Sequence, residues 1–147
     1  MRNTCVKCDK EVVLDSSGRC KECFNEWQRE YRKRTSNKAI RAYEKTAKGY
    51  LVRTYRNMLS RVKGILKKKA HLYEGLEILD KDEFYDWSLK SNYSDLLKAY
   101  KDSEYDMKLA PSIDRRDPLK GYTLENIRWI THSENSSNTR HKKIKEE

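Results

Sequence analysis

Four cysteines in the first 23 residues constrain this chain more than any other feature of its sequence. Cys5 and Cys8 form one Cys-x-x-Cys pair, and Cys20 and Cys23 form a second pair after eleven intervening residues. Two such pairs place four thiolates around a tetrahedral Zn²⁺ ion, with Zn–S distances of about 2.3 Å. The spacing therefore predicts a closed, structural zinc module over residues 1–24, without a catalytic role. Disulfides are the alternative, and a reducing cytoplasm disfavours them.

The insert between the cysteine pairs, VVLDSSGR, combines two β-branched residues with a Ser-Ser-Gly turn. This pattern is typical of a short hairpin, so we expect one between the pairs. The first residues lack the apolar core of a secretory signal. No stretch of the chain approaches the roughly 20 consecutive apolar residues that span a membrane. We therefore expect a cytoplasmic protein with reduced cysteines and no membrane partner.

The supply of core-forming side chains is small for a chain of 147 residues. Hydrophobic residues make up 36% of the chain and charged residues 38%. Because so little apolar surface is available for burial, we expect a modular protein that is helped by a metal. The predicted fold class is α+β and mostly helical, with an N-terminal zinc ribbon or finger, basic helices, and a C-terminal motif of two strands and a helix.

Positive charge is concentrated in one block of the sequence. The net charge is +10, and residues 19–69 carry 17 Lys and Arg against 4 Asp and Glu. Residues 70–113 are acidic, with 5 basic and 10 acidic side chains. A basic block of this density is typical of a surface that binds nucleic-acid phosphates. The alternative is a solvated basic helix without a ligand.

Apolar residues recur at helical spacing inside the basic block. Phe24, Trp27 and Tyr31 predict one helix, residues 35–37 predict its end, and Gly49 is expected to interrupt the pattern again. The apolar stripe of a second helix, expected to build core, consists of Tyr50, Leu51, Tyr55, Met58, Leu59 and Val62. The predicted contacts with a nucleic-acid backbone are Arg53, Arg56, Arg61, Lys63, Lys67, Lys68, Lys69 and, further along the chain, Arg116.

The acidic segment 70–113 carries no chemistry of its own. The stretches DKDEFYDWSLK and NYSDLLKAYKDS each predict a short helix with apolar residues at helical spacing. We expect these helices to form a packing platform for the segment that follows.

The C-terminal segment 110–141 predicts two strands and a helix. Residues 112–113 are extended, and Asp117–Gly121 combine proline and glycine in turn chemistry. Residues 126–130 alternate well enough for a second strand.

The helix of this segment has a clear start. Thr131 and Glu134 have the spacing of a capping box, which predicts that the helix begins there. His132 and Asn135 lie three residues apart and therefore share one face of it.

This order of elements resembles the HNH nuclease family, also called His-Me finger or ββα-metal nucleases. The residues that carry the resemblance are Asp114, Asn126, Trp129 and Asn135, although we expect Trp129 to serve the core. The whole chain is also similar to phage-encoded HNH-type proteins that begin with a four-cysteine zinc module. In those proteins YRNM, HLYEGL, an aromatic helix and SIDR-D---GYT-EN--W-T-SEN follow one another in that order.

The resemblance implies roles for single residues. In the family the first strand ends in an Asp-His pair, in which the Asp binds a metal and the His is the general base. Asp114 matches the Asp, and Arg115 stands in the place of the His. Asn126 matches the residue that ties the loop, and Asn135 matches the last metal ligand on the helix. Asp114 and Asn135 offer oxygen ligands, which suit catalytic Mg²⁺ or Mn²⁺.

Arg115 is the point at which this chain departs from the family. A guanidinium has no acceptor lone pair, so Arg115 cannot take a proton from water. It can hold a scissile phosphate and stabilise charge in the transition state, as can Arg116. Three sources of a base stay open: His132, His71, or a hydroxide formed on the metal without a side-chain base. Loss of a general base typically costs about 10²- to 10⁴-fold in rate, so a slow nuclease is consistent with Arg115.

The resemblance also implies a division into domains. We expect a zinc module over residues 1–24, a basic helical segment over 25–69, and an HNH-like domain over 70–147 whose ββα core covers 110–141.

The predicted function is that of an HNH-type, metal-dependent endonuclease that hydrolyses DNA, with RNA as an alternative substrate. Asp114, Arg115, His132 and Asn135 are the expected catalytic group. If the protein is phage-encoded, the host cytoplasm is its place of action. A non-catalytic nucleic-acid-binding or regulatory protein that reuses this scaffold is the alternative function, and a monomer and a homodimer both fit.

Overall fold

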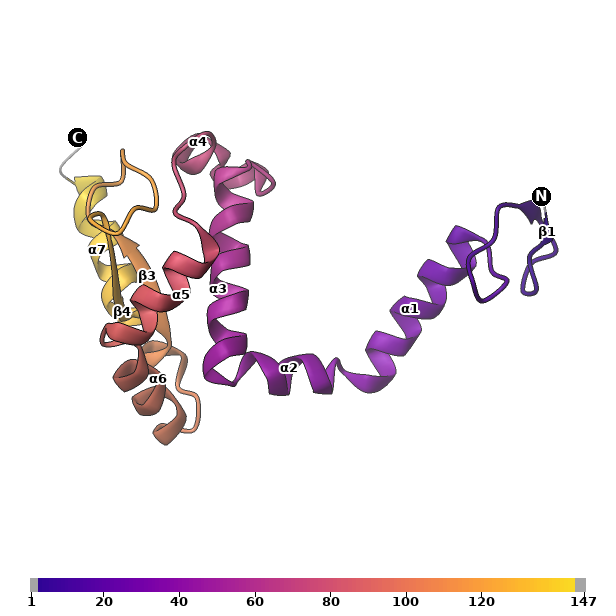
Figure 1. The fold of residues 1–147 in the computed structure, drawn as a ribbon, viewed down its shortest axis with the longest axis horizontal. Helices are drawn as coiled ribbons and strands as arrows, with labels where there is room; N and C mark the ends of the chain where they lie inside the picture. The colour runs from indigo at the N-terminus through magenta and orange to yellow at the C-terminus, as the bar shows by residue number, and fades with distance from the viewer. Residues whose placement is uncertain (1–2, 145–147) are drawn as a thin grey trace. The chain divides into compact units, whose positions relative to one another are not determined.

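The computed structural model of the protein describes residues 3–144, with side chains up to residue 138, and it is mainly helical with two small sheets (Figure 1). This confirms the α+β class. The chain divides into two compact units, residues 1–43 and residues 44–147. The basic segment 25–69 is shared between them, because its second half is buried in the core of the second unit. Within residues 3–144, no helix has the length and apolar character that a membrane crossing requires. The last three residues of the predicted C-terminal domain lie outside the described residues.

The first unit is a small module built around the cysteine pairs. Strand β1 (Asn3–Thr4) pairs antiparallel with β2 (Glu11–Val12), and the two strands enclose the first cysteine pair. The prediction of a hairpin between the pairs is therefore wrong. The predicted Ser-Ser-Gly turn is present, and Asp15 Oδ1 accepts hydrogen bonds from the backbone N–H groups of Ser17 and Arg19 within it.

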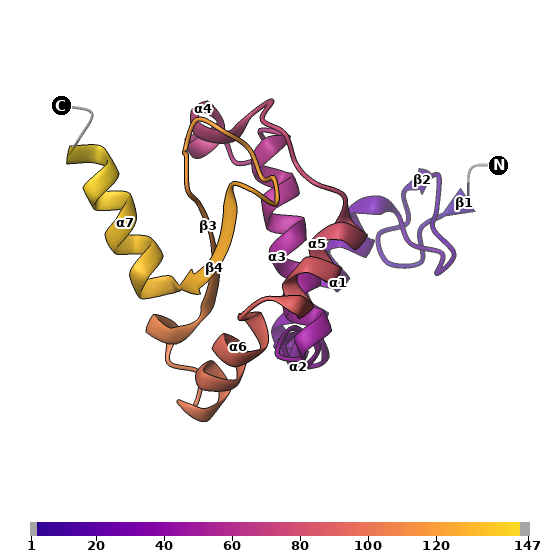
Figure 2. The same cartoon turned by 60° about the vertical axis from the view of Figure 1, so that its left-hand side comes forward.

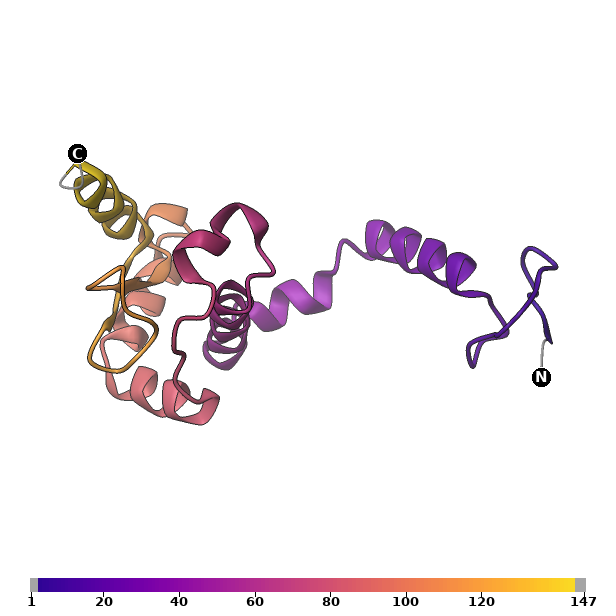
Figure 3. The same cartoon turned by 90° about the horizontal axis from the view of Figure 1, so that it is seen from above.

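Helix α1 (Lys21–Thr35) begins directly after Cys20, which caps it, and contains Cys23 (Figure 3). It ends where Ser36 and Asn37 both have a φ of 52°, a left-handed backbone that an α-helix cannot continue. The predicted break at residues 35–37 is confirmed. Helix α2 (Lys38–Glu44) begins after it.

Helix α3 (Ala47–Val62) begins at a threonine cap. Thr46 Oγ1 accepts a hydrogen bond of 3.0 Å from the backbone N–H of Gly49. The predicted interruption at Gly49 is wrong, because this glycine lies inside the first turn and the cap satisfies its amide. The chain breaks earlier, between α2 and α3. The stripe of α3 does build core, and its buried members are Tyr50, Leu51, Met58 and Val62.

Short helices form the middle of the second unit. They are the 3-10 helix η1 (Lys67–Lys69), α4 (Ala70–Tyr73), α5 (Lys81–Lys90), α6 (Tyr93–Asp102) and the 3-10 helix η2 (Met107–Leu109). Phe84 of α5 and Tyr93 of α6 are fully buried. The two helices contact each other, α5 also contacts α3, and α6 contacts the C-terminal strands (Figure 1). They form the packing platform that the sequence predicts.

The C-terminal strands form one antiparallel pair (Figure 2). Strand β3 (Pro111–Arg115) and strand β4 (Ile127–Thr131) place Ile113 opposite Trp129, and Asp114 opposite Arg128. Trp129 is 2% exposed and donates its indole N–H to Ser88 Oγ at 3.0 Å, so it serves the core as expected.

Helix α7 (His132–Ile144) follows β4 without a linker (Figure 2). Glu134 Oε2 accepts a hydrogen bond of 2.8 Å from Thr131 N, and Glu134 N donates to Thr131 Oγ1 at 3.2 Å. The predicted capping box is therefore confirmed.

The loop between β3 and β4 is joined to the segment before α5. Ile78 and Tyr122 form a parallel bridge, in which Tyr122 N donates to Glu77 O at 2.7 Å and Leu79 N donates to Tyr122 O at 2.8 Å. Gly121 lies against the backbone of Glu77 so closely that an added Cβ would overlap it. The bridge therefore holds Tyr122 in a fixed place beside the core.

Candidate functional site

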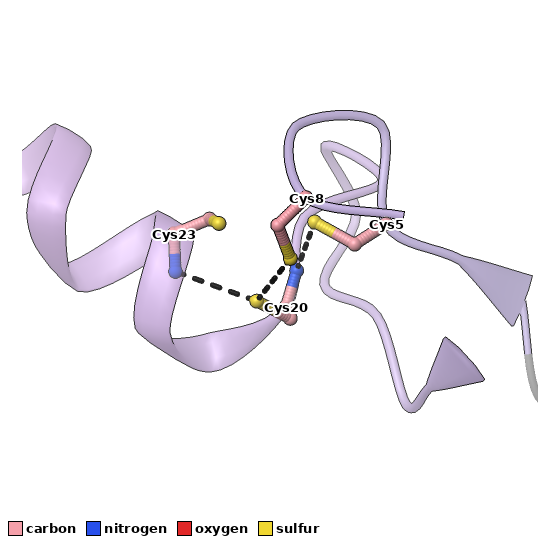
Figure 4. A group of neighbouring side chains, drawn as sticks. All are labelled: Cys5, Cys8, Cys20 and Cys23. Atoms are coloured by element: carbon pink, nitrogen blue, oxygen red, sulfur yellow. Dashed lines mark hydrogen bonds between the residues drawn. The ribbon is translucent and has the colours of Figure 1, made fainter. Parts of the chain in front are cut away.

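The four cysteine sulfurs of the first unit converge on one point (Figure 4). All four Sγ atoms lie within 4.8 Å of one another, and Cys8 Sγ is 3.7 Å from Cys20 Sγ. Four thiolates at about 2.3 Å from one tetrahedral zinc ion would be about 3.8 Å apart. All four cysteines are free, and Cys5, Cys20 and Cys23 are buried. The cluster therefore has the geometry to hold a structural metal such as zinc.

The thiols of this cluster perturb one another. Hydrogen bonds from the backbone N–H groups of Cys20 and Lys7 lower the pKa of the Cys5 thiol to about 6. Hydrogen bonding with Cys20, followed by burial, raises the pKa of Cys23 to about 12. Four thiols this close cannot all ionise without a cation between them, and a divalent ion stabilises every thiolate at once. The chemistry of the donor set thus fits zinc.

A cavity of about 490 Å³ in the second unit brings together the residues that the sequence predicts to be catalytic. Its lining consists of Arg61, Lys69, Leu72, Tyr73, Ser112, Ile113, Asp114, Arg115, Pro118, Tyr122, His132, Asn135 and Ser136. Strand β3 supplies the Asp-Arg pair, the first turn of α7 supplies His132 and Asn135, and α3 supplies Arg61. Among the residues whose side chains the structure describes, three Lys or Arg side chains and one carboxylate line this cavity, so its charge favours an anion.

Asp114 is buried at the cavity and forms an ion pair. Its side chain is 5% exposed, and its Oδ2 accepts hydrogen bonds of 2.9 Å from both Nε and Nη2 of Arg128. Sequence reasoning did not single out Arg128. The register of the two strands could have indicated it, because Asp114 and Arg128 face each other across β3 and β4.

Arg115 braces the loop between the strands. Its Nη1 donates to the carbonyl oxygens of Pro118 and Lys120, both at 3.0 Å. Its guanidinium carbon lies 4.1 Å from the centre of the Tyr73 ring, which is a cation–π distance. Arg115 therefore contributes to the shape of the cavity wall as well as to its charge.

Asn126 closes the same loop from the other end. Its Oδ1 accepts a hydrogen bond from Asp117 N at 2.8 Å, and its Nδ2 donates to Asp117 O at 3.0 Å and to Gly121 O at 2.8 Å. The side chain is 5% exposed, so these bonds lie in a water-poor environment where their loss is costly.

The first turn of α7 is held against β3. Asn135 Nδ2 donates to Ser112 Oγ at 2.8 Å and to Ile113 O at 3.1 Å. His132 N donates to Ala110 O at 2.8 Å, while its imidazole is exposed at the cavity. His71 is exposed on α4 and, among the described residues, is outside the set that lines the cavity.

Arg61 of α3 lines this cavity. Its Nη1 donates to Tyr122 Oη at 3.3 Å, and its Nε is buried without a hydrogen-bond partner among the described residues. Burial raises the pKa of Tyr122, so the phenol keeps its proton as a donor. Arg61 thus brings a positive charge to the cavity, whereas its Nε is closed off from solvent.

The remaining predicted phosphate contacts lie outside this cavity. Arg53 lines a neighbouring cavity of about 130 Å³, which shares Arg61, Ser112 and Ile113 with the first. Arg53 and Arg56 both form ion pairs with Glu44, at 3.5 and 3.4 Å. Four further predicted contacts are exposed, namely Lys63, Lys67, Lys68 and Arg116.

Three members of the site went unnoticed in the sequence: Arg128, Tyr73 and Tyr122. The two tyrosine rings are nearly parallel, with centroids 6.1 Å apart. The guanidinium groups of Arg61 and Arg115 both lie at cation–π distance from the Tyr73 ring. Such stacking joins α4 to the loop 116–126 and becomes visible only when the chain is folded.

Comparison with protein families, with curated proteins and with solved structures finds no match for this chain. The assignment of its function therefore depends on the geometry of the site and on the chemistry of its residues.

Proposed function

We propose that the second unit is a metal-dependent endonuclease of HNH type that hydrolyses phosphodiester bonds of DNA. The observation that supports this most is the one cavity shared by Asp114, His132 and Asn135, with Arg61 and Lys69 at its side. The order of strand, loop, strand and helix around this cavity is the order that the sequence resemblance implies. The charge of the lining also suits a phosphodiester.

In this proposal Arg61 and Lys69 bind the scissile phosphate. Arg61 lines the cavity, and its guanidinium charge would pair with a phosphate oxygen there. The phenol of Tyr122 receives its hydrogen bond from Arg61 and keeps its own proton to donate to the same phosphate. Arg115 acts mainly by shaping the wall, because its Nη1 donates to two loop carbonyls.

Asp114 and Asn135 would hold the divalent ion. A carboxylate and an amide oxygen are hard ligands that suit Mg²⁺ or Mn²⁺, and both side chains line the cavity. When bound, the ion would supply positive charge to the phosphate and the leaving oxygen. Arg128 competes for the Asp114 carboxylate, so the ion pair has to loosen when a metal ion binds.

His132 is the side chain best placed to take the proton of the attacking water. It stands at the first position of α7 with its imidazole at the cavity, and a neutral imidazole has an acceptor nitrogen. Arg115 has no acceptor, and His71 lies outside the lining.

Cleavage of supercoiled plasmid in Mg²⁺ or Mn²⁺ tests the proposal. Asp114→Asn and Asn135→Ala should each reduce the rate about 10²-fold or more, and His132→Gln about 10²- to 10⁴-fold. Asp86→Asn, which removes an exposed carboxylate on α5, is the matched control and should cleave like the wild type. Circular dichroism of each variant checks its fold. Equal rates in the wild type and in all three site variants would overturn the proposal.

A second candidate is a nucleic-acid-binding protein without catalysis. The observation that favours it is the Asp114–Arg128 ion pair, which neutralises the Asp114 carboxylate at the cavity. In that case the wild type would bind DNA and leave plasmid intact with either metal.

A further inference from the structure

Helix α1 carries a ladder of aromatic rings, which we define as Phe24, Trp27 and Tyr31. The ring centroids of Phe24 and Trp27 are 5.9 Å apart, and those of Trp27 and Tyr31 are 5.5 Å apart with an angle of 27° between the planes. Trp27 is 39% exposed and Tyr31 is 46% exposed. Large aromatic side chains of this kind normally contribute to a core, so their exposure needs a reason.

Arginines lie over two rings of the ladder. The guanidinium carbon of Arg19 is 5.2 Å from the centre of the Trp27 ring, and that of Arg34 is 5.6 Å from the centre of the Tyr31 ring. Both are cation–π distances, which place planar, positively charged groups against the aromatic faces. The ladder therefore combines stacking surfaces with donors for phosphate.

The opposite face of α1 holds the metal module. Lys7 pairs with Glu26 at 2.8 Å, and Lys10 pairs with Glu22 at 2.9 Å. At about 100° per residue, these two glutamates lie roughly opposite the ladder. The buried cluster of this module consists of three cysteines, with Cys8, Val12 and Leu14 packed against them, so the described residues of that cluster do not include the ladder.

The positive charge around the ladder indicates which kind of ligand this surface binds. Residues 19–43 contain 8 Lys and Arg against 3 Asp and Glu, and two of those three glutamates face lysines of the module. A second copy of this chain would bring the same positive charge to the ladder, which opposes self-association. A polyanion with flat aromatic groups matches both the arginines and the rings.

We infer that the aromatic ladder of α1 is a binding site for single-stranded nucleic acid, whose unpaired bases stack on Trp27 and Tyr31. Bases in a duplex are stacked on each other and present only their edges, whereas unpaired bases expose their faces to aromatic side chains. The bases take the places that the guanidinium groups of Arg19 and Arg34 hold over these rings, and the two arginines turn to the phosphates between the stacked bases. This site lies within the first unit and does not depend on the activity proposed for the cavity.

Fluorescence anisotropy of the full-length, zinc-containing protein tests this inference. The probes are a short labelled oligothymidylate and a labelled duplex of the same length, without Mg²⁺. Replacing Trp27 and Tyr31 together by alanine should weaken binding of the single strand about tenfold or more and change duplex binding about twofold at most. The variant keeps every charge, so its salt dependence should equal that of the wild type.

Three controls make the result specific. Val13→Ala removes an exposed apolar side chain from the same module and should bind like the wild type. Trp27→Phe keeps an aromatic ring at this position and should keep most of the wild-type affinity for the single strand. Asp86→Asn removes an exposed carboxylate from the second unit and should leave binding to the single strand unchanged. Zinc content and circular dichroism confirm that each variant is folded.

The inference fails if the double alanine variant binds the oligothymidylate like the wild type. It also fails if the affinities for single strand and duplex weaken equally, since the ladder would then contact only the nucleic-acid backbone and not the bases. Wild-type dimerisation that disappears in the double variant, measured by sedimentation, would assign the ladder to a second copy of the chain instead.

Discussion

Arg128 of β4 holds the carboxylate of Asp114 of β3 through two nitrogens, Nε and Nη2, each 2.9 Å from the same oxygen. The two residues are direct partners in the antiparallel register, so the strands themselves impose the pair. Asp114 is the residue proposed to bind a divalent ion, and Arg128 already supplies a positive charge there. The ion pair thus links the stability of the strand pair to the occupation of the cavity.

Arg128→Gln should lower the free energy of unfolding by about 2 kcal/mol, because it leaves the buried Asp114 carboxylate without its partner. The same variant should gain more stability from Mg²⁺ than the wild type does, since the ion no longer competes with a guanidinium. Urea unfolding with and without Mg²⁺ measures both effects. Arg116→Gln removes an exposed arginine from the adjoining loop and serves as the control. An identical response of Arg128→Gln and wild type to Mg²⁺ would contradict the proposed competition.

The arginines of α3 should differ in their effect on nucleic-acid binding. Arg61→Gln should reduce both affinity and cleavage, because its guanidinium lines the cavity. Arg53→Gln and Arg56→Gln should reduce affinity less, since both arginines already form ion pairs with Glu44. Each lost phosphate contact should flatten the slope of log affinity against log salt by about 0.9 on duplex DNA. Titrations at several salt concentrations give these slopes, and an unchanged slope in the triple variant would remove α3 from the interface.

Metal removal should unfold the cysteine module. We expect one zinc ion per chain by elemental analysis, and chelation should abolish amide protection in the first turns of α1. Cys20→Ser is an informative variant, because Cys20 caps α1 and serine is itself a good cap. Loss of zinc and of protection in this variant would therefore report on the metal alone. Hydrogen exchange of α3 provides the internal reference and should stay slow. Zinc bound at wild-type stoichiometry in Cys20→Ser would refute the four-cysteine site.

Tyr50 should make stability sensitive to alkaline pH. Its hydroxyl donates to Pro111 O at 2.6 Å, and burial raises the pKa of the phenol to about 12. The unfolded chain ionises Tyr50 near pH 10, about two units earlier. The folded state therefore gains from the neutral phenol below about pH 10, and this gain, at most about 3 kcal/mol, is lost as pH rises towards 12. Urea unfolding of the wild type and Tyr50→Phe should show a stability difference that shrinks across this range. A difference independent of pH would contradict this assignment.

Much of the helical structure follows from local patterns. The stripe of α3 and the capping box of Thr131 and Glu134 were predictable because residues three and four apart decide them. Gly49 was misjudged, since a glycine in a first turn costs little when Thr46 caps its amide. The Ser-Ser-Gly turn was predictable from its residues, whereas the pairing of β2 with β1 rather than with a strand after the turn was not.

The candidate site was predictable only in part. The sequence order placed Asp114, His132 and Asn135 in neighbouring elements, and the fold brings them to one cavity. The bonds of Arg115 to loop carbonyls and the pairing of Arg128 with Asp114 depend on strand register and loop closure. Contacts of this kind join parts of the chain that are distant in sequence, so no periodic pattern of residues predicts them.

The close approach of Gly121 to Glu77 has a consequence for variation at this position. In a deep mutational scan scored by folding, position 121 should tolerate glycine and little else, because any Cβ would overlap backbone rather than a movable side chain. The neighbouring Leu119 is 82% exposed and should accept most substitutions. When sequences of relatives accumulate, a glycine one residue before a buried aromatic should therefore be a more dependable marker of this loop than the residues of its exposed tip.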